Sequence, residues 1–441
     1  MSPSISAACD SRFDLSMVRT SHCAMRFSFI HAADLHIDSP LAALGRKNPE
    51  AAAFFAQAGR RAVQALVEDA IGSKAAFLII AGDVFDGDWA DVSTGLFFMR
   101  ELVKLERANI PVFMLRGNHD AASRMSRSLQ WPANVREFST RTANSFEIEP
   151  LRTVLHGRGF PDRAVEDGFV AKYPQRRDGW LNIGVLHTSL DGRPGHDPYA
   201  PCAISDLRNF GYDYWALGHI HQAEVVDRDP WIVYPGNLQG RSIRETGAKG
   251  AMRVTVEDGR IVGAEPIELD AARWAHVQID AAMCDDLDGL CAHIHDHLDQ
   301  AYANAAGKAL AARITIIGET ALHDSLLTDR ATLEEQALGI AERVSSQCWI
   351  EKIRLDTSPL RRVHDGVDEH LETKSLNFDV ILDEAAADPE FAAQFEALAS
   401  EIRQKLPREL QDVFDRDVLA DASLDTSKRY LTGVFQKGFK P

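Results

Sequence analysis

Short apolar runs alternate with longer amphipathic segments along residues 26–265. Residues 77–81, Phe-Leu-Ile-Ile-Ala, form a continuous apolar run, which is typical of a fully buried strand. Residues 92–108 are predicted to form a helix with Leu96, Met99 and Val103 on one apolar face. Further strands are predicted at 26–33, 110–115, 181–186, 214–217, 231–234 and 252–256. This mixture predicts an α/β fold, a β-sandwich flanked by helices.

The pattern changes near residue 270. Strands are predicted at 276–279, 312–317 and 349–355, with helices at 285–304 and 331–345. This order describes a small βαβαβ domain, which we place at residues 270–358. From 360 to 441 we expect a helical C-terminal segment, in which Asp388 and Pro389 begin one helix.

Composition and charge narrow the class of protein. The 441 residues are enough for two or three domains, and 45% hydrophobic with 26% charged residues is typical of a soluble globular protein. A net charge of −17 argues against a general DNA-coating protein. It does not exclude an enzyme that acts on nucleic acid, because bound metals and local basic patches can oppose the global charge.

Localisation signals are weak in this sequence. No apolar run approaches the roughly 20 residues that span a membrane, so we expect no membrane association. The six cysteines are scattered without a CxxC pair, which fits a reducing cytoplasm. Residues 1–24 lack the apolar core of a signal peptide. They are interpreted either as a disordered tail or as a start site assigned too early, with Met25 as the true start.

Five motifs follow apolar runs in the first half of the chain and offer ligands for metals. They are Asp34-Leu35-His36, Gly82-Asp83-Val84-Phe85-Asp86, Gly117-Asn118-His119-Asp120, His187, and Gly218-His219-Ile220-His221. Side chains just beyond the carboxyl ends of strands converge on one edge of a sheet. Asp, Asn and His without Cys suit Mn²⁺, or alternatively Fe²⁺ or Zn²⁺, better than a structural zinc site. Two such ions sharing a carboxylate commonly hydrolyse phosphate esters.

Each motif alone has an ordinary explanation, because Asp, Asn and Gly are common in turns and caps. The prediction of a metal site rests on all five motifs occurring in this order, each after an apolar run. Asp34 and His36 are two residues apart, so in an extended backbone they point to the same side. Asp83 is the best candidate to bridge two metals, since a carboxylate has two oxygens. His119 follows Asn118 and can act as an acid, a base or a charge stabiliser.

In this order the motifs resemble those of the calcineurin-like metallophosphoesterases. The residues His31–His36 and Ala81–Asp86 are similar to the DNA-repair exonuclease branch, which comprises SbcD-type nuclease subunits and YhaO-like relatives. The resemblance covers about residues 26–265 and extends to Tyr234-Pro235-Gly236-Asn237-Leu238. Some members of the branch carry a histidine where this sequence has Asp86, so the resemblance assigns that position no role.

The resemblance implies a role for each motif. One metal would be held by Asp34, His36, Asp83 and His221, and the other by Asp83, Asn118, His187 and His219. His119 would face the scissile phosphate as the catalytic residue. Residues 25–265 would be the catalytic domain, and 270–358 a candidate DNA-capping domain.

The implied function is a two-metal phosphodiesterase, preferably with Mn²⁺, that acts on DNA ends as an exonuclease in DNA repair. A phosphatase or phosphodiesterase with another substrate, and a largely non-catalytic scaffold for an ATPase, remain alternatives. The implied partner is an SbcC-type SMC-like ATPase, bound by the segment 360–441, and a homodimer is also considered. The apolar stripe in that segment could equally pack on the protein's own core; it consists of Phe391, Phe395, Leu398 and Ile402.

Basic residues near the motifs are candidate substrate contacts, although most Lys and Arg side chains are simply solvated. The main candidates are Arg124, Arg127, Arg241 and Arg244, and the others are Lys249, Lys172, Arg176 and Arg177. His293, His295 and His297 look like a metal cluster, but in a helix only His293 and His297 share a face. We therefore interpret them as helix surface.

Overall fold

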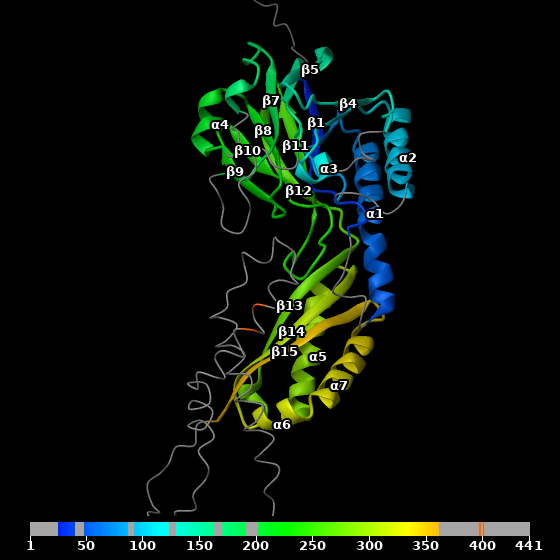
Figure 1. Cartoon of the computed structure of the whole chain (residues 1–441), viewed down its shortest axis with the longest axis vertical. Helices are drawn as coiled ribbons and strands as arrows, with labels where there is room; N and C mark the ends of the chain where they lie inside the picture. Colours follow the sequence, from blue (N-terminus) through cyan, green and yellow to red (C-terminus); the bar gives the residue numbers. More distant parts are fainter. Residues whose placement is uncertain are drawn as a thin grey trace, which may run out of the picture. The chain divides into compact units, whose positions relative to one another are not determined.

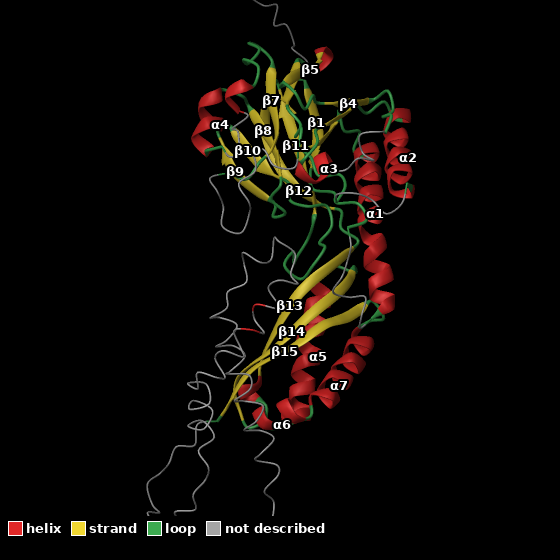
Figure 2. Ribbon diagram, viewed as in Figure 1, coloured by secondary structure: helices red, strands yellow, loops and turns green. Residues whose placement is uncertain are grey.

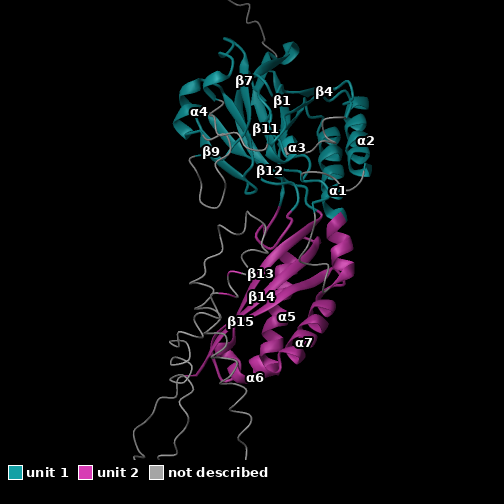
Figure 3. Ribbon diagram, viewed as in Figure 1, with its two compact units in different colours: residues 1–39, 57–239, 249–270 teal, residues 40–56, 240–248, 271–441 magenta. Residues whose placement is uncertain are grey.

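The computed structural model describes residues 25–39, 48–86, 92–122, 129–162, 170–190 and 202–360, together with Ala397 and Ser400. The chain divides into two compact units (Figure 3). The first unit comprises residues 1–39, 57–239 and 249–270, and the second comprises 40–56, 240–248 and 271–441. The expected N-terminal tail and almost all of the predicted C-terminal helical segment lie outside the described residues.

The first unit is built on two six-stranded sheets (Figures 1 and 2). One sheet has the order β12-β11-β1-β2-β3-β4, with β1 to β4 parallel to one another. Its strands are β1 (Arg26–Ala32), β2 (Leu78–Ile80), β3 (Val112–Met114), β4 (Val135–Glu137), β11 (Gly250–Glu257) and β12 (Arg260–Glu268).

The second sheet has the order β5-β6-β7-β8-β10-β9, with β6, β7 and β8 parallel. Its strands are β5 (Asn144–Ile148), β6 (Thr153–Gly157), β7 (Leu181–His187), β8 (Tyr214–Gly218), β9 (Glu224–Arg228) and β10 (Trp231–Tyr234). In each sheet the parallel strands are neighbours, so their carboxyl ends reach the same edge of that sheet.

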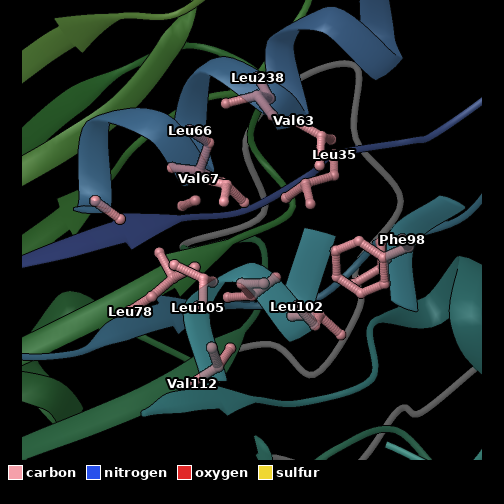
Figure 4. Close-up of a cluster of buried hydrophobic side chains, with 14 of the residues drawn as sticks. Leu35, Val63, Leu66, Val67, Leu78, Phe98, Leu102, Leu105, Val112 and Leu238 are labelled. Carbon is pink, nitrogen blue, oxygen red and sulfur yellow. The ribbon is translucent and has the colours of Figure 1, made fainter. Parts of the chain in front are cut away.

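Three buried clusters show how the layers stack. Helices α1 (Pro49–Gly72) and α2 (Ser93–Arg107) pack on the outer face of the first sheet, where Leu66 and Leu102 share a cluster with Leu78 (Figure 4). Side chains such as Phe29 and Ile183 fill the space between the sheets. Helix α4 (Ile204–Phe210) covers the outer face of the second sheet through Leu207, beside Trp215. The predicted sandwich flanked by helices is confirmed.

The helix predicted at 92–108 is present as α2, but the face with Leu96, Met99 and Val103 is not the one that it buries. Leu96 has a relative exposure of 56%. The helix instead buries Phe98, Leu102 and Leu105. Apolar residues occur around most of this helix, so periodicity alone could not decide which stripe faces the sheet.

The second unit contains the predicted βαβαβ pattern. Its parallel sheet has the order β13-β14-β15, formed by β13 (Ala272–Asp280), β14 (Ala309–Thr320) and β15 (Cys348–Pro359). The connecting helices are α5 (Leu287–Asn304), α6 (His323–Thr328) and α7 (Arg330–Val344). Leu298 of α5 and Ile340 of α7 share one core with Ile314 of the sheet. In the parts of the chain that the structure describes, no helix is long and apolar enough to cross a membrane.

Candidate metal centre

The loops that follow the central strands of both sheets carry the predicted ligands. The first sheet supplies Asp34 and His36 after β1, Asp83 after β2 and Asn118 after β3. The second supplies His187 at the end of β7, and His219 and His221 after β8. Asn118 begins a short helix, α3 (Asn118–Ala122). All seven belong to the first unit; His219 and His221 are partly buried and the other five are buried.

The backbone at this edge is held in uncommon conformations. Asp34, Asp83 and His219 have φ angles of 51°, 54° and 98°, in the region that non-glycine residues rarely adopt. Backbone hydrogen bonds support these turns: Asp34 N donates to Gly82 O at 3.0 Å, and His36 N donates to Asp83 O at 3.1 Å. Such strain persists only where surrounding contacts enforce it, and it clusters at functional sites.

One group of ligand atoms surrounds His36. Its Nε2 lies 3.2 Å from Nε2 of His221 and 3.9 Å from Oδ1 of Asp34. His221 Nε2 and Asp34 Oδ1 are 3.8 Å apart. Ligands at about 2.1 Å from one ion lie roughly 3 to 3.5 Å from each other, so these three side chains are nearly at binding distance.

A second group surrounds His187. Its Nε2 lies 2.9 Å from Oδ1 of Asn118 and 3.3 Å from Oδ2 of Asp83. The His219 ring packs edge-on against it, with 5.3 Å between ring centroids. Nδ1 of His187 is held by the Ala81 carbonyl oxygen at 2.9 Å, which points Nε2 toward the group. A backbone partner of this kind commonly orients a metal-binding imidazole.

Two carboxylates connect the groups. Oδ2 of Asp83 lies 3.3 Å from His187 and 3.9 Å from His36, which places it between them. Asp34 also belongs to both sets of potential ligands, the one with His36 and His221 and the one with Asp83 and His187. The sequence had offered only Asp83 as the shared ligand.

The chemistry of the donors fits two cations. In the metal-free cluster, burial lowers the pKa of His187, but Asp83 and Asp34 outweigh this effect and raise the pKa to about 9. Burial likewise raises the pKa of Asp83, and its histidine neighbours outweigh that effect and hold the pKa well below its usual range. The buried carboxylates thus require positive charge beside them, which a proton or a bound cation can supply.

Two glycines allow the loops that carry the ligands to approach one another closely. A Cβ added to Gly117 would overlap the Asp83 carboxylate, and one added to Gly218 would overlap the Ala81 carbonyl oxygen. The glycines of the GNHD and GHIH motifs therefore make room for the ligands rather than bind anything themselves.

His119 is paired with Asp86. Its Nδ1 lies 2.8 Å from Oδ1 of Asp86, and the Ser39 hydroxyl donates to Oδ2 of the same carboxylate at 2.6 Å. Burial raises the pKa of Asp86, but hydrogen bonds from His119 and His36 outweigh this and hold it well below its usual range. The His119 side chain is about one third exposed, at 33%. The sequence assigned no role to Asp86, and the GDxxD spacing was the available signal.

Asp120, the last residue of the GNHD motif, also has a place that the sequence did not predict. Its carboxylate accepts hydrogen bonds from the backbone of Phe85 at 2.9 Å, and of Val84 and Gly117 at 3.2 Å. It therefore joins the loop after β2 to the loop after β3, which carry Asp83 and Asn118.

Four of the basic candidates have partners within the protein: Lys249, Arg241, Arg176 and Arg177. Lys249 is buried and its Nζ donates to the His221 carbonyl oxygen at 2.9 Å, so it braces a ligand loop. Arg241 pairs with Glu245 at 3.2 Å in the second unit, which also contains Arg244. Arg176 donates to the Gly211 carbonyl oxygen, and Arg177 pairs with Glu147. Arg124 and Arg127 lie outside the described residues.

His293 and His297 lie on one face of α5, as expected, with 6.3 Å between ring centroids. Nδ1 of His297 is 2.8 Å from the His293 carbonyl oxygen. Both residues are exposed, in keeping with a helix surface.

The sandwich and its edge of aspartate and histidine side chains define a metal-dependent phosphoesterase. Residues 27–223 match the family of the calcineurin-like phosphoesterases, and residues 274–358 match the middle domain of the metallophosphoesterase YhaO. The chain is 32% identical over 337 residues to a protein of Bacillus subtilis (strain 168) called uncharacterized metallophosphoesterase YhaO. The match covers 75% of this chain and 81% of that protein. The chain belongs to the calcineurin-like phosphoesterase family.

A similar solved structure is that of a dimetal phosphatase from Danio rerio. It superposes with a TM-score of 0.33 at 14% sequence identity, over 55% of this chain and 99% of that one. A likeness at this level carries no argument about the substrate.

Proposed function

We propose that this phosphoesterase is a two-metal phosphodiesterase that acts on DNA ends, with Mn²⁺ as the preferred ion. The main observation behind this proposal is that Asp83 lies between the two groups of potential metal ligands. His119 lies beside them and is paired with Asp86. Two bound divalent cations would neutralise charge on a phosphate ester and make water a stronger nucleophile.

The protein's own residues would orient the reaction. Asp86 accepts a hydrogen bond from Nδ1 of His119, so the proton destined for the leaving oxygen would be carried at Nε2. The same carboxylate stabilises the positive imidazole form. Asp83 Oδ1 accepts a hydrogen bond from the His119 backbone N at 2.9 Å, which ties this residue to the ligand cluster.

Two features support DNA as the substrate. The residues around the first two motifs are similar to the DNA-repair exonuclease branch, including SbcD-type nuclease subunits. The chain also carries a βαβαβ unit at 271–360, matched by the YhaO middle-domain family at 274–358, and we propose a DNA-capping role for it. Arg124, Arg127, Arg241 and Arg244 remain the candidate contacts with the DNA backbone.

The test compares three substrates with and without Mn²⁺: end-labelled duplex DNA, bis-p-nitrophenyl phosphate and p-nitrophenyl phosphate. We expect stepwise release of nucleotides from the duplex, and hydrolysis of the diester faster than the monoester. Hydrolysis of the small esters with intact duplex DNA would contradict the proposed substrate and leave the phosphoesterase chemistry in place.

The alternative is a phosphatase or phosphodiesterase with a substrate other than DNA. Faster hydrolysis of the monoester than of the diester would support this alternative.

We further propose that residues 360–441 bind an SbcC-type SMC-like ATPase, in which case the chain also serves as its scaffold. The sequence there carries the apolar stripe of Phe391, Phe395, Leu398 and Ile402, which suits a groove for an amphipathic helix. Deletion of residues 385–441 should weaken co-elution with the ATPase and spare Mn²⁺ binding. Unchanged co-elution would contradict this partner site, and sedimentation of the full chain alone tests a homodimer.

A further inference from the structure

His31 is a fully buried histidine that is not among the candidate metal ligands of the five motifs. It lies on β1 between Phe29 and Ala33, which both belong to the core between the two sheets. Because side chains alternate along a strand, His31 points into that same interior. Its Nδ1 lies 3.0 Å from the Tyr214 hydroxyl, and its Nε2 lies 3.1 Å from the Leu217 carbonyl oxygen. Tyr214 and Leu217 are on β8, so both contacts cross from one sheet to the other.

The two hydrogen bonds have a definite direction. Burial lowers the pKa of His31 to about 3, partly opposed by the bond to Leu217, so the imidazole is neutral. A neutral imidazole has one donor and one acceptor nitrogen. The Leu217 carbonyl can only accept, so Nε2 donates to it and Nδ1 accepts from the Tyr214 hydroxyl. Both hydrogen bonds therefore form in only one tautomer of His31, the one with the proton on Nε2.

Such a pair constrains the sandwich more sharply than its apolar neighbours do. Phe29, Phe77 and Ile183 pack between the sheets without a preferred direction, so a small slide of one sheet would retain most of that contact. Hydrogen bonds weaken steeply when their geometry changes. The His31 contacts therefore favour one position of β8 relative to β1.

The loops that hold the metal ligands begin just beyond this pair. Asp34 comes three residues after His31, and His219 comes two residues after Leu217. The Asp34 carboxylate accepts hydrogen bonds from the His219 backbone N at 2.9 and 3.2 Å. Both residues have positive φ angles, 51° and 98°, which the surrounding structure must enforce.

We propose that His31 is a positioning residue for the metal centre. Its two hydrogen bonds set the carboxyl end of β8 against that of β1. This holds the GHIH ligands of the second sheet at binding distance from Asp34 and His36 of the first. The inference rests on the metal centre of the proposed function, and it is independent of DNA as the substrate.

The main experiment compares His31→Leu with His156→Leu. His156 is also buried, with Nδ1 at 2.7 Å from the Ser145 hydroxyl and Nε2 at 3.4 Å from Asn182 Oδ1. Its partners lie on strands of its own sheet, so its loss does not affect the link between sheets. Thermal unfolding of the metal-free proteins reports stability, and calorimetric titration with Mn²⁺ reports affinity.

We expect both variants to unfold at lower temperature, because each loses the polar contacts of a buried imidazole. Only His31→Leu should bind Mn²⁺ more weakly, by about 10-fold or more, the usual effect of losing a group that orients metal ligands. In His31→Gln the side-chain amide keeps a donor and an acceptor. This variant should recover part of the lost affinity.

A milder pair covers the case in which His31→Leu does not fold. Tyr214→Phe removes only the hydroxyl that donates to His31. Tyr212→Phe is its control, because the Tyr212 hydroxyl donates to the carbonyl oxygen of Pro174, which is not part of a ligand loop. We expect a several-fold weaker Mn²⁺ affinity in Tyr214→Phe alone.

Wild-type Mn²⁺ affinity in folded His31→Leu or in Tyr214→Phe would overturn the proposal. So would an equal loss of affinity in the control variant of either pair. Failure to cleave DNA would contradict the proposed substrate and would leave these binding results unchanged.

Discussion

Nδ1 of His119 lies 2.8 Å from Oδ1 of Asp86. The two residues come from different motifs, and the Ser39 hydroxyl holds the far oxygen of the carboxylate at 2.6 Å. A carboxylate in this position sets the tautomer of an imidazole and stabilises its protonated form. The fifth residue of the GDVFD motif therefore serves His119 as well as neighbouring the ligand His36.

Replacing Asp86 should test this pairing. Asp86→Asn keeps the size of the side chain and removes the negative charge that supports a protonated His119. We expect kcat on bis-p-nitrophenyl phosphate to fall by about 10-fold or more, with KM and Mn²⁺ stoichiometry little changed. Steady-state kinetics and metal analysis check this. A loss of bound metal equal to the loss of rate would mean that Asp86 acts as a ligand.

His119 itself should separate catalysis from metal binding. His119→Leu should retain both metals and lose about 10²- to 10⁴-fold in single-turnover rate, the usual contribution of one acid–base group. His219→Leu should instead lower metal occupancy, because its ring packs against His187 in the ligand cluster. Metal stoichiometry, DNA affinity and rate are measured on both variants. Equal metal loss in the two would make His119 a ligand.

Asp83 should be the most damaging ligand to lose. Its Oδ2 lies between His187 and His36, and its Oδ1 holds the His119 backbone. Asp83→Asn should abolish hydrolysis and reduce bound metal toward one ion or none, as measured by elemental analysis of the folded protein. Asp258→Asn, on the turn between β11 and β12, is a surface control. Two bound ions with near-normal activity would show that Asp83 is not the bridge.

Metal binding should depend on pH through His187. In the metal-free protein its pKa is raised from 6.5 to about 9, so a proton occupies the site below that pH. Metal must displace this proton, and Mn²⁺ affinity should rise by up to about tenfold per pH unit until the pH reaches about 9. Calorimetry at pH 7.5 in buffers of different ionisation enthalpy should detect proton release. No release at that pH would contradict the assignment of His187.

The same shift has a consequence for the metal-free protein. A folded-state pKa above the unfolded value of 6.5 contributes stability that is present in full below pH 6.5 and is lost as the pH rises through about 9. The metal-free protein, prepared with a chelator, should therefore unfold at lower temperature at pH 9 than at pH 7. The Mn²⁺-loaded protein should show a smaller change, since the cation replaces the proton.

Helix α1 carries sequence signals for a helix, although the sequence analysis does not predict it. Residues 49–72 form a helix of 24 residues with Pro49 at its start and Glu50 in the first turn, signals that mark a helix start. We predicted no helix there. Its alanine-rich sequence gives a weak periodicity, and burial of residues such as Ala62 and Val63 depends on the sheet against which they pack.

The sequence by itself determined strands such as β1, β2, β3, β7 and β8 and the βαβαβ order of the second unit, because hydrophobic periodicity follows from local backbone geometry. It did not predict α1 or the edge strands β4 and β12. It also determined the candidate ligands, since their side-chain chemistry and their places after apolar runs are written in the chain. The tertiary structure decided what joins them: Asp34 in both ligand groups, Asp86 against His119, and His31 against β8. Asp86 and His119 lie 33 residues apart in sequence and meet because β2 and β3 are neighbours in one sheet. His31 and Leu217 lie 186 residues apart, and the packing of the two sheets brings them together.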